Sequence, residues 1–436
     1  MFIAVDDTDS REGMCTTFLA TELIREFKEY QLIDYPRLVR LNPNVPWKTR
    51  GNGAIVLEIG IGRKKKQRIG HIEKDIDLYN KEEEIKEDLL DRTKNIVERW
   101  ARFDSDKTNP GIVIAKERPD RSIYEKAVRD IVSFEEIVDI LDEGLYKYKG
   151  YRKKRGLIGA TSALAWRPND YTYEIIAYRE KRRWGTKREI EENDVIRLDN
   201  TLESSFDNYD YEEESSAIDP NSPCPVLYGV RGDDPVELQN SLGIIKSEHV
   251  ERWITFLTNQ ATDDHIQIKS IDNIKPWNSV KIKGTVVSSP KVIEGGHVFF
   301  DIEENEQRIT AAAYEPTKGF REIIKKLIVG DKVELYGGIR KEPITINIEK
   351  IRIISLAKKE VKVGNPRCPK CGKRMSSVGK NAGFRCKRCS TKASEEDIEL
   401  EIVERDLEER WYEPPVSARR HLAKPLTRMK KDIHHG

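Results

Sequence analysis

The sequence has no long apolar segment, few cysteines and almost no net charge. None of its apolar runs approaches the roughly 20 residues that a membrane-spanning helix needs. Its first residues, with three aspartates directly after a short apolar run, lack the layout of a signal peptide. There are six cysteines in 436 residues, and four of them stand in paired spacing, which is typical of a metal site in a reducing compartment rather than of disulfides. We therefore expect a soluble, cytoplasmic protein without a membrane segment.

The formal net charge of +1 conceals a separation of charges along the chain. Residues 189–219 are rich in Asp and Glu, whereas residues 362–389 contain many Lys and Arg and no Asp or Glu. The segment after Pro414 is basic as well. This asymmetry predicts a polyanionic partner for the C-terminal part of the chain. Solvated charged faces are the alternative, and they explain the acidic stretch better than the basic one.

The N-terminal residues combine a short apolar run with a group of carboxylates. Residues 2–5 predict a buried strand, and Asp6, Asp7 and Asp9 follow it. Crowded carboxylates repel one another unless a cation holds them, and Mg²⁺ prefers carboxylates, waters and substrate phosphates. Thr16 stands where a helical pattern begins, so the strand, acidic turn and helix start predict a metal–phosphate site. An Asp-rich turn followed by a Thr N-cap is the alternative.

A second candidate phosphate site is the loop between two predicted strands, at residues 36–41 and 54–59. Glycines allow backbone N–H groups to approach phosphate oxygens, and Lys and Arg supply positive charge. The Walker A spacing is absent, and a long hairpin loop is the plainer alternative. The expected phosphate ligands are Asn42, Asn44, Lys48, Thr49, Arg50, Gly51, Asn52 and Gly53.

Strands that alternate with helices predict a first α/β domain at residues 1–145, followed by an α+β domain at residues 146–245. Residues 246–275 are expected to be a linker, with a helix over Ser247–Leu257. At residues 276–358, five short alternating strands with one helix between the third and the fourth follow the order of an OB-fold. That fold often presents a groove to oligonucleotides, so this binding expectation rests on analogy.

Four cysteines near the C-terminus form a CxxC…CxxC pair. Its spacing matches a tetrahedral zinc ribbon, expected at residues 359–412, in which four thiolates leave no open position for catalysis. The predicted zinc ligands are Cys368, Cys371, Cys386 and Cys389. Basic residues around them and in the tail at 413–436 are expected to contact the phosphate backbone of a nucleic acid. These are Arg385, Lys387, Arg388, Arg419 and Arg420.

Three motifs together resemble one known family: Asp6 to Ser10 with residues 13–17, the loop at 41–53, and Ser417 to Leu422. The motifs and the domain order resemble the archaeal agmatinylcytidine synthetase that modifies the minor isoleucine tRNA, over nearly the whole chain. The fold that the resemblance implies is multidomain, α/β and α+β. It consists of an N-terminal α/β kinase-like domain, a ferredoxin-like domain, an OB-fold and a C-terminal zinc ribbon.

The resemblance implies an ATP-dependent ligase. In that family ATP activates the 2-carbonyl oxygen of the wobble cytidine in a CAU anticodon, and agmatine's primary amine displaces the activated oxygen. AMP and phosphate are released, and the tRNA then reads AUA as isoleucine. By this resemblance Asp6, Asp7 and Asp9 hold Mg²⁺ on ATP, and Thr16 is autophosphorylated. The expected agmatine ligands are Phe206, Asp207 and Asp210, with the segment Gly159–Ala160 as the alternative.

Two other classes of protein stay open from the sequence. A non-catalytic single-strand-binding protein built on the OB-fold and the ribbon would leave the acidic N-terminal motif without a purpose. A Mg²⁺-dependent phosphohydrolase without an RNA substrate would leave the basic C-terminal half unexplained.

Overall fold

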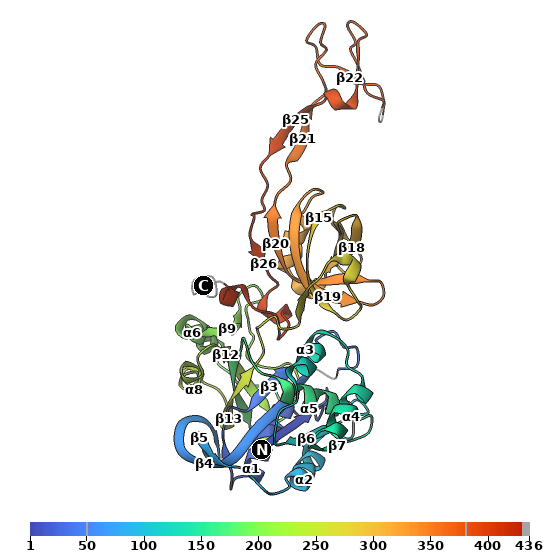
Figure 1. Cartoon of the computed structure of the whole chain (residues 1–436). Helices are drawn as coiled ribbons and strands as arrows, with labels where there is room; N and C mark the ends of the chain where they lie inside the picture. The colour runs from blue at the N-terminus through green and yellow to red at the C-terminus, as the bar shows by residue number, and fades with distance from the viewer. Residues whose placement is uncertain (49–50, 380–381, 430–436) are drawn as a thin grey trace.

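The computed structural model of the protein describes residues 1–48, 51–379 and 382–429. They form a body built on one large sheet, a barrel-like sheet next to it, and a small cysteine-rich unit at the far end of a long two-stranded ladder (Figure 1). In these ranges no helix combines the length and the apolar character needed to cross a membrane.

Strand β1 (Phe2–Asp6) lies inside the large sheet, and all five of its residues are buried. It pairs antiparallel with β4 (Gly53–Ile72) and β6 (Gly111–Ala115). Within the described residues the sheet has eleven strands in the order β7-β6-β1-β4-β3-β13-β8-β12-β9, with β2 and β5 beside β4. The other strands are β2 (Gln31–Leu32), β3 (Arg37–Arg40), β5 (Lys74–Glu83), β7 (Lys147–Gly150), β8 (Thr172–Arg179), β9 (Ser205–Phe206), β12 (Val226–Gly232) and β13 (Val250–Thr258).

Helices α1 (Thr16–Glu26) and α5 (Gly156–Ala165) pack against this sheet, and most of their residues are buried. Small residues at close spacing allow α5 to pack tightly, and β1, β4 and β6 all contact it. The other helices of the body are α2 (Leu90–Trp100), α3 (Arg121–Arg129), α4 (Phe134–Glu143), α6 (Glu192–Thr201), α7 (Pro235–Leu238) and α8 (Ser241–Ile244). A two-stranded pair, β10 (Tyr209–Asp210) and β11 (Ser215–Ser216), lies outside the sheet.

The helix expected over Ser247–Leu257 is wrong, because these residues contain strand β13. It pairs antiparallel with β8 and β4 and parallel with β3. Its Arg252 is 7% exposed and forms an ion pair with Glu22 of α1. The stretch expected to be a linker therefore carries a strand that joins the first two parts of the chain into one sheet.

The barrel-like sheet has its own core, in which Val280, Phe300 and Leu335 are at most 1% exposed. Its strand order is β14-β15-β19-β20-β18-β17-β16, an additional β15–β17 pairing closes it, and β26 pairs with β20. A helix lies between β18 and β19 in the sequence, where one was expected. The elements are β14 (Ile266–Ile268), β15 (Ser279–Val286), β16 (Lys291–Val292), β17 (Val298–Glu304), β18 (Gln307–Ala313), α9 (Gly319–Lys325), β19 (Lys332–Arg340), β20 (Thr345–Ser355) and β26 (Trp411–Tyr412).

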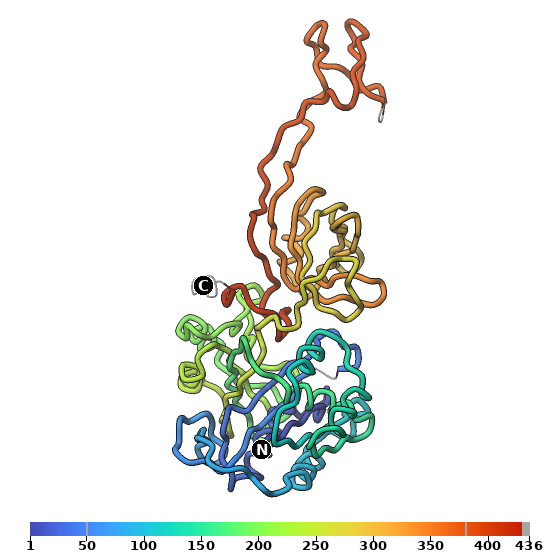
Figure 2. The backbone as a smooth tube through the Cα atoms, in the orientation of Figure 1, coloured from blue at the N-terminus to red at the C-terminus, as the bar shows by residue number. Residues whose placement is uncertain are grey.

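A ladder of β21 (Lys359–Gly364) and β25 (Glu399–Val403) carries the cysteine-rich unit away from the barrel. That unit holds three short strands, β22 (Ser376–Ser377), β23 (Phe384–Arg385) and β24 (Lys392–Ala393). The chain then runs back beside the barrel to the body (Figure 2). There the Ala261 N–H donates to the His421 carbonyl at 2.8 Å, and the Asp263 N–H donates to the Leu422 carbonyl at 2.9 Å. The described part of the predicted tail is thus built into the fold.

Candidate active site

A cavity of about 540 Å³ lies where the sheet, the start of α1 and the returning C-terminal segment meet. It brings together the acidic motif, the loop at 41–53 and the C-terminal motif, which are far apart in the sequence. The expected site residues that line it are Asp6, Asp7, Asp9, Thr16, Asn42, Lys48, Gly51, Asn52, Gly53, Asp207 and Arg419. Thr49 and Arg50 lie outside the described residues.

The acidic turn begins where β1 ends. Burial, and secondarily the charge of Asp7, raise the pKa of Asp6 well above its ordinary value. The Asp6 carboxylate lies against Gly159 of α5, where an added Cβ would be only 1.7 Å from Asp6 Oδ2. Asp7 has a φ of 58° and accepts hydrogen bonds at Oδ2 from the Asn109 N–H at 3.1 Å and Nδ2 at 3.3 Å. Two carboxylates are thus held at the cavity in fixed positions, and a bound cation would relieve their repulsion.

Thr16 is the first residue of α1, and its Oγ1 accepts a hydrogen bond from Thr8 Oγ1 at 3.1 Å. The alternative of a Thr N-cap is wrong, because Cys15 occupies the N-cap position and makes no side-chain capping hydrogen bond. The first-turn N–H groups of a helix carry partial positive charge and favour anions. Thr16 and the helix start therefore suit a phosphate-bearing ligand in this cavity.

Cations also line the cavity. Burial and the nearby Arg420 lower the pKa of Lys48 to about 8. Arg40 also lines the cavity; its buried Nε has no hydrogen-bond partner among the described residues, and burial lowers its pKa. Arg40, together with burial and Arg231, lowers the pKa of His421 well below its ordinary value. Crowded cations with lowered pKa values indicate that an anion belongs between them.

The two glycines of the loop at 41–53 make room for Arg40. An added Cβ would lie 2.5 Å from Arg40 Nη1 at Gly51 and 2.8 Å from the same atom at Gly53. Both glycines line the cavity, as expected, but their immediate effect is to admit a guanidinium group. Lys48 of the loop and Arg40, which directly precedes the loop, both line the cavity.

The lowered pKa of Lys48 predicts that ATP binding weakens in mildly alkaline solution. Lys48 carries its charge below its pKa of about 8 and loses it above. The apparent Kd for ATP should be constant below about pH 7 and then rise up to about tenfold per pH unit above pH 8. Equilibrium binding of radiolabelled ATP across this range measures the effect. Lys48→Arg stays charged and should give a flat profile, whereas an unchanged step in this variant would contradict the assignment.

Of the three expected agmatine ligands, only Asp207 lines the cavity. Asp207 has a φ of 56° and forms an ion pair with Arg419. Asp210 instead accepts hydrogen bonds from the N–H groups of Ser417 at 2.9 Å and Glu212 at 3.1 Å. Phe206 is 6% exposed and lies in β9 outside the cavity lining. The alternative residue Gly159 does reach the cavity.

The arginines of the C-terminal motif have carboxylate partners. Arg419 pairs with Asp207 and, at 2.9 Å, with Glu413. Arg420 Nη1 lies 3.3 Å from Glu349 Oε1 of the barrel and donates to Asn44 Oδ1 at 2.5 Å. Asn44 is thus bound to the barrel and the C-terminal motif and does not line the cavity.

Several lining residues escaped the sequence reasoning. They are Arg40, Glu174, Arg231, His421 and the segment at 216–222. His421 belongs to the C-terminal motif, and Arg40 directly precedes the phosphate loop, so these two had a local signal. Glu174 and Arg231 are isolated charges among the apolar residues of β8 and β12, and only the sheet order brings them to the cavity.

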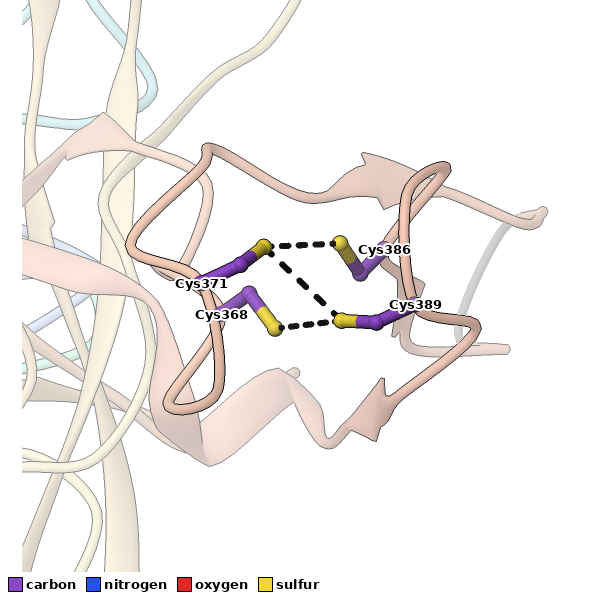
Figure 3. Close-up of side chains that lie close together, drawn as sticks. All are labelled: Cys368, Cys371, Cys386 and Cys389. Atoms are coloured by element: carbon purple, nitrogen blue, oxygen red, sulfur yellow. Dashed lines mark hydrogen bonds between the residues drawn. The ribbon is translucent and has the colours of Figure 1, made fainter.

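The four predicted zinc ligands converge at the end of the ladder (Figure 3). The Sγ atoms of Cys368 and Cys389 are 3.2 Å apart, those of Cys371 and Cys386 3.5 Å, and those of Cys389 and Cys371 3.8 Å. Tetrahedral coordination at a Zn–S distance of about 2.3 Å requires S···S distances of about 3.8 Å. The backbone N–H groups of Cys389 and Arg388 lower the pKa of Cys386, which favours a thiolate. The donor set and its geometry fit zinc.

In the part of the chain that the structure describes, these cysteines are the only group of three or more Cys, His, Asp or Glu residues whose ligand atoms converge closely enough for a metal. The carboxylates of Asp6, Asp7 and Asp9 line one cavity but do not converge to that extent. Mg²⁺ does not require such convergence, because it binds through one or two carboxylates while waters and substrate phosphates complete its shell.

The exposed basic residues Arg385, Lys387 and Arg388 lie on the cysteine-rich unit, far along the ladder from the cavity (Figure 1). The structure therefore separates the five expected RNA-contacting residues into two sets. Three face solvent on the distal unit, and Arg419 and Arg420 lie at the cavity and the barrel.

Comparison with known proteins gives matches along nearly the whole chain. Residues 2–151 match the TiaS TCKD domain, residues 154–265 the TiaS FLD domain, and residues 365–407 the TiaS C-terminal zinc ribbon domain. The tRNA 2-agmatinylcytidine synthetase TiaS of Methanocaldococcus jannaschii is 45% identical over 440 residues, which cover 98% of each protein.

Solved structures agree with this likeness. The crystal structure of TiaS in complex with its tRNA and ATP has a TM-score of 0.84 and 39% identity, and covers 98% of this chain and 97% of that chain. The crystal structure of TiaS in complex with its tRNA, AMPCPP and agmatine has a TM-score of 0.82 and 36% identity, with the same coverage.

The fold and the cavity define the class first: the protein is a multidomain α/β enzyme with a C-terminal zinc ribbon. Sequence identity of 45% over 98% of this chain and 98% of its relative then assigns it to one family within that class. The chain belongs to the family of tRNA 2-agmatinylcytidine synthetases, TiaS.

Proposed function

We propose that this chain uses ATP to attach agmatine to carbon 2 of the wobble cytidine in the minor isoleucine tRNA, which has a CAU anticodon. The observation that carries the proposal is one cavity lined both by the carboxylates of Asp6, Asp7 and Asp9 and by the cations Lys48 and Arg40, in a member of this family. ATP activates the 2-carbonyl oxygen, agmatine's primary amine displaces it, and AMP and phosphate leave. Chemistry on a base requires that the cytidine leave the stack and enter the cavity.

The carboxylates, the cations and Thr16 of the cavity have different roles in this reaction. Asp6, Asp7 and Asp9 would hold Mg²⁺, which neutralises charge on the triphosphate during phosphoryl transfer. Lys48 and Arg40 supply fixed positive charge to the phosphates. Thr16, at the start of α1, offers the hydroxyl that accepts a phosphoryl group in autophosphorylation.

Asp207 is the carboxylate that we assign to the cationic substrate. It lines the cavity with one carboxylate oxygen already bound to Arg419. A charge-assisted hydrogen bond to agmatine's guanidinium group would use its remaining lone pairs. Phe206 and Asp210 flank Asp207 in the sequence, and Asp210 accepts hydrogen bonds from the N–H groups of Glu212 and Glu213 in the turn that follows.

We assign the parts of the chain to domains as follows. The first part, residues 1–145, is the kinase-like domain, and the ferredoxin-like domain extends to residue 265, because β13 completes its sheet. The barrel-like sheet is an OB-fold, and residues 359–412 form a ribbon around a structural Zn²⁺. Exposed Arg385, Lys387 and Arg388 on the ribbon bind tRNA phosphates, and the protein works in the cytoplasm with its tRNA.

Incubation with radiolabelled agmatine, ATP, Mg²⁺ and a transcript of the CAU-anticodon isoleucine tRNA tests the proposal. Label should enter the RNA only when ATP is present. Asp207→Asn should raise the KM for agmatine by about 10- to 100-fold, because a charge-assisted hydrogen bond is lost. Glu413→Gln is the matched control, because it removes the other carboxylate partner of Arg419 and leaves Asp207 in place. Tight, salt-dependent tRNA binding without incorporation would favour a non-catalytic binding protein instead.

A further inference from the structure

We propose that Asn44, Arg420 and Gly338 form a junction between the barrel-like sheet and the phosphate loop, residues 41–53. Through this junction the position of the barrel on the body determines the position of the loop. Asn44 and Arg420 are positioning residues in this proposal, since they act through Lys48 and the cavity wall rather than on a substrate. The proposal rests on the proposed function for its link to agmatine transfer, but its effect on ATP binding stands independently.

Asn44 fastens the phosphate loop to the first long strand of the barrel. Its Nδ2 lies 3.2 Å from the Trp277 carbonyl, 3.1 Å from the Asn278 carbonyl and 2.8 Å from Ser279 Oγ. Ser279 is the first residue of β15. A primary amide has only two N–H donors, so these acceptors use both N–H donors of the Asn44 side chain. Lys48, which lines the cavity, follows Asn44 closely in the same loop.

Within the loop, further amide hydrogen bonds make this link rigid. Asn42 Oδ1 accepts from the Asn44 N–H at 2.9 Å, and Asn42 Nδ2 donates to the Trp277 carbonyl at 3.1 Å and the Asp130 carbonyl at 3.2 Å. Asn52 Nδ2 donates to the Asn42 carbonyl at 3.1 Å, which ties the end of the loop to its beginning. A shift of the barrel strand therefore shifts Asn42, Asn44 and Asn52 together.

On the barrel side, Gly338 of β19 provides the space that the junction needs. Gly338 is the register partner of Ser279. An added Cβ at Gly338 would lie 2.3 Å from Asn44 Oδ1 and 3.1 Å from Arg420 Nη1. Barrel, loop and C-terminal motif meet here in direct contact, and a single methyl group would push them apart.

Arg420 extends the junction to the C-terminal wall of the cavity. Its Nη1 donates to Asn44 Oδ1 at 2.5 Å and lies 3.3 Å from Glu349 Oε1 on β20. Glu349 Oε2 lies 2.9 Å from Nε2 of the fully buried His265, so the carboxylate is held from both sides. The next residue in the chain, His421, lines the cavity. The same group of side chains thus fixes two walls of the cavity relative to the barrel.

A double-mutant cycle tests the junction through equilibrium binding of radiolabelled ATP. Gly338→Ala should weaken ATP binding about tenfold or more, since small misplacements of a positioning group have large effects. Asn44→Ala should weaken it as well. The double variant should bind ATP no more weakly than Asn44→Ala alone, because the added methyl group then meets no amide. Asn44→Asp, which keeps the side-chain volume and loses the donors to the barrel, should match Asn44→Ala.

Gly243→Ala is the control, because an added Cβ there would meet nothing within 4 Å. This variant should bind ATP like the wild type, and tRNA affinity should change less than about threefold in every variant. Single-turnover agmatine transfer at saturating tRNA should fall together with ATP binding. Wild-type ATP affinity in Gly338→Ala, or additive losses in the double variant, would overturn the junction. Wild-type protein that binds ATP but transfers no agmatine would instead overturn the proposed function. In that case the double-mutant cycle measured by ATP binding would still test the junction.

Discussion

Asp7→Asn is expected to abolish ATP-dependent agmatine transfer while tRNA binding keeps its wild-type strength. Asp7 lines the cavity directly after β1, and Asn109 holds its Oδ2 through two hydrogen bonds. Asparagine has the same shape and still offers a carbonyl oxygen to Asn109, but it lacks the negative charge that holds a divalent cation on the triphosphate. The loss in rate should be about 100-fold or greater. Initial rates with labelled agmatine, together with filter binding of the tRNA, measure both quantities.

Asp104→Asn is the matched control for this experiment. Asp104 pairs with Arg102, its side chain is 56% exposed, and it does not line the cavity. This variant should transfer agmatine at the wild-type rate. A transfer rate within tenfold of the wild type in Asp7→Asn would show that the acidic turn does not serve phosphoryl transfer. A parallel loss of tRNA binding would assign Asp7 to RNA recognition.

Removal of zinc is expected to unfold the ribbon, weaken tRNA binding and leave ATP binding unchanged. The core of the ribbon consists mainly of Cys368, Met375, Phe384 and Cys386, which is too small to fold without the metal. Its unfolding would disperse the exposed Arg385, Lys387 and Arg388. At moderate salt the tRNA affinity should fall about tenfold or more. The slope of log K against log salt should become shallower by roughly 0.7 to 0.9 for each phosphate that the ribbon ceases to neutralise.

Cys386→Ser produces the same effect without a chelator, and Ser377→Ala on the neighbouring strand β22 is its control. Ser377 is exposed and donates to the Gly379 carbonyl at 3.2 Å, away from the ligand set. Truncation of the chain from residue 366 would be a poor substitute, because it also removes Arg419 and His421 from the cavity. Unchanged tRNA affinity in zinc-free protein with intact ATP binding would refute a role of the ribbon in holding tRNA.

Local patterns predicted those parts of the fold that depend on nearby residues. The apolar run of β1, the CxxC spacing of the ribbon and the helix between β18 and β19 all appear where the sequence indicated them. Strand β13 did not, because Glu251 and Arg252 interrupt its apolar residues and suggest an amphipathic helix. The buried charge of Arg252 is compensated by an ion pair with Glu22, which lies more than two hundred residues earlier in the sequence. No local pattern contains that information.

In the candidate site, too, local patterns predicted some residues, whereas contacts between distant segments could not be predicted. The acidic motif and the glycine-containing loop follow strands directly, so their residues could be chosen from the sequence. The engagement of Arg419 with Asp207, and of Asn44 with Ser279, depends on how the chain returns from the ribbon and how the barrel is seated. Those contacts join distant segments, and they change the role of Asn44 from an expected phosphate ligand to a link between two parts of the protein.

The return of the C-terminal segment to the cavity has a consequence for biosynthesis. Proteins are made from the N-terminus, and domains generally fold as units in that order. Asp6 precedes Arg419 by more than four hundred residues, so the cavity wall that contains Arg419 and His421 can form only after the barrel and the ribbon have been synthesised. A chain that stops before Trp411 therefore lacks both the last strand of the barrel-like sheet and the C-terminal wall of the cavity.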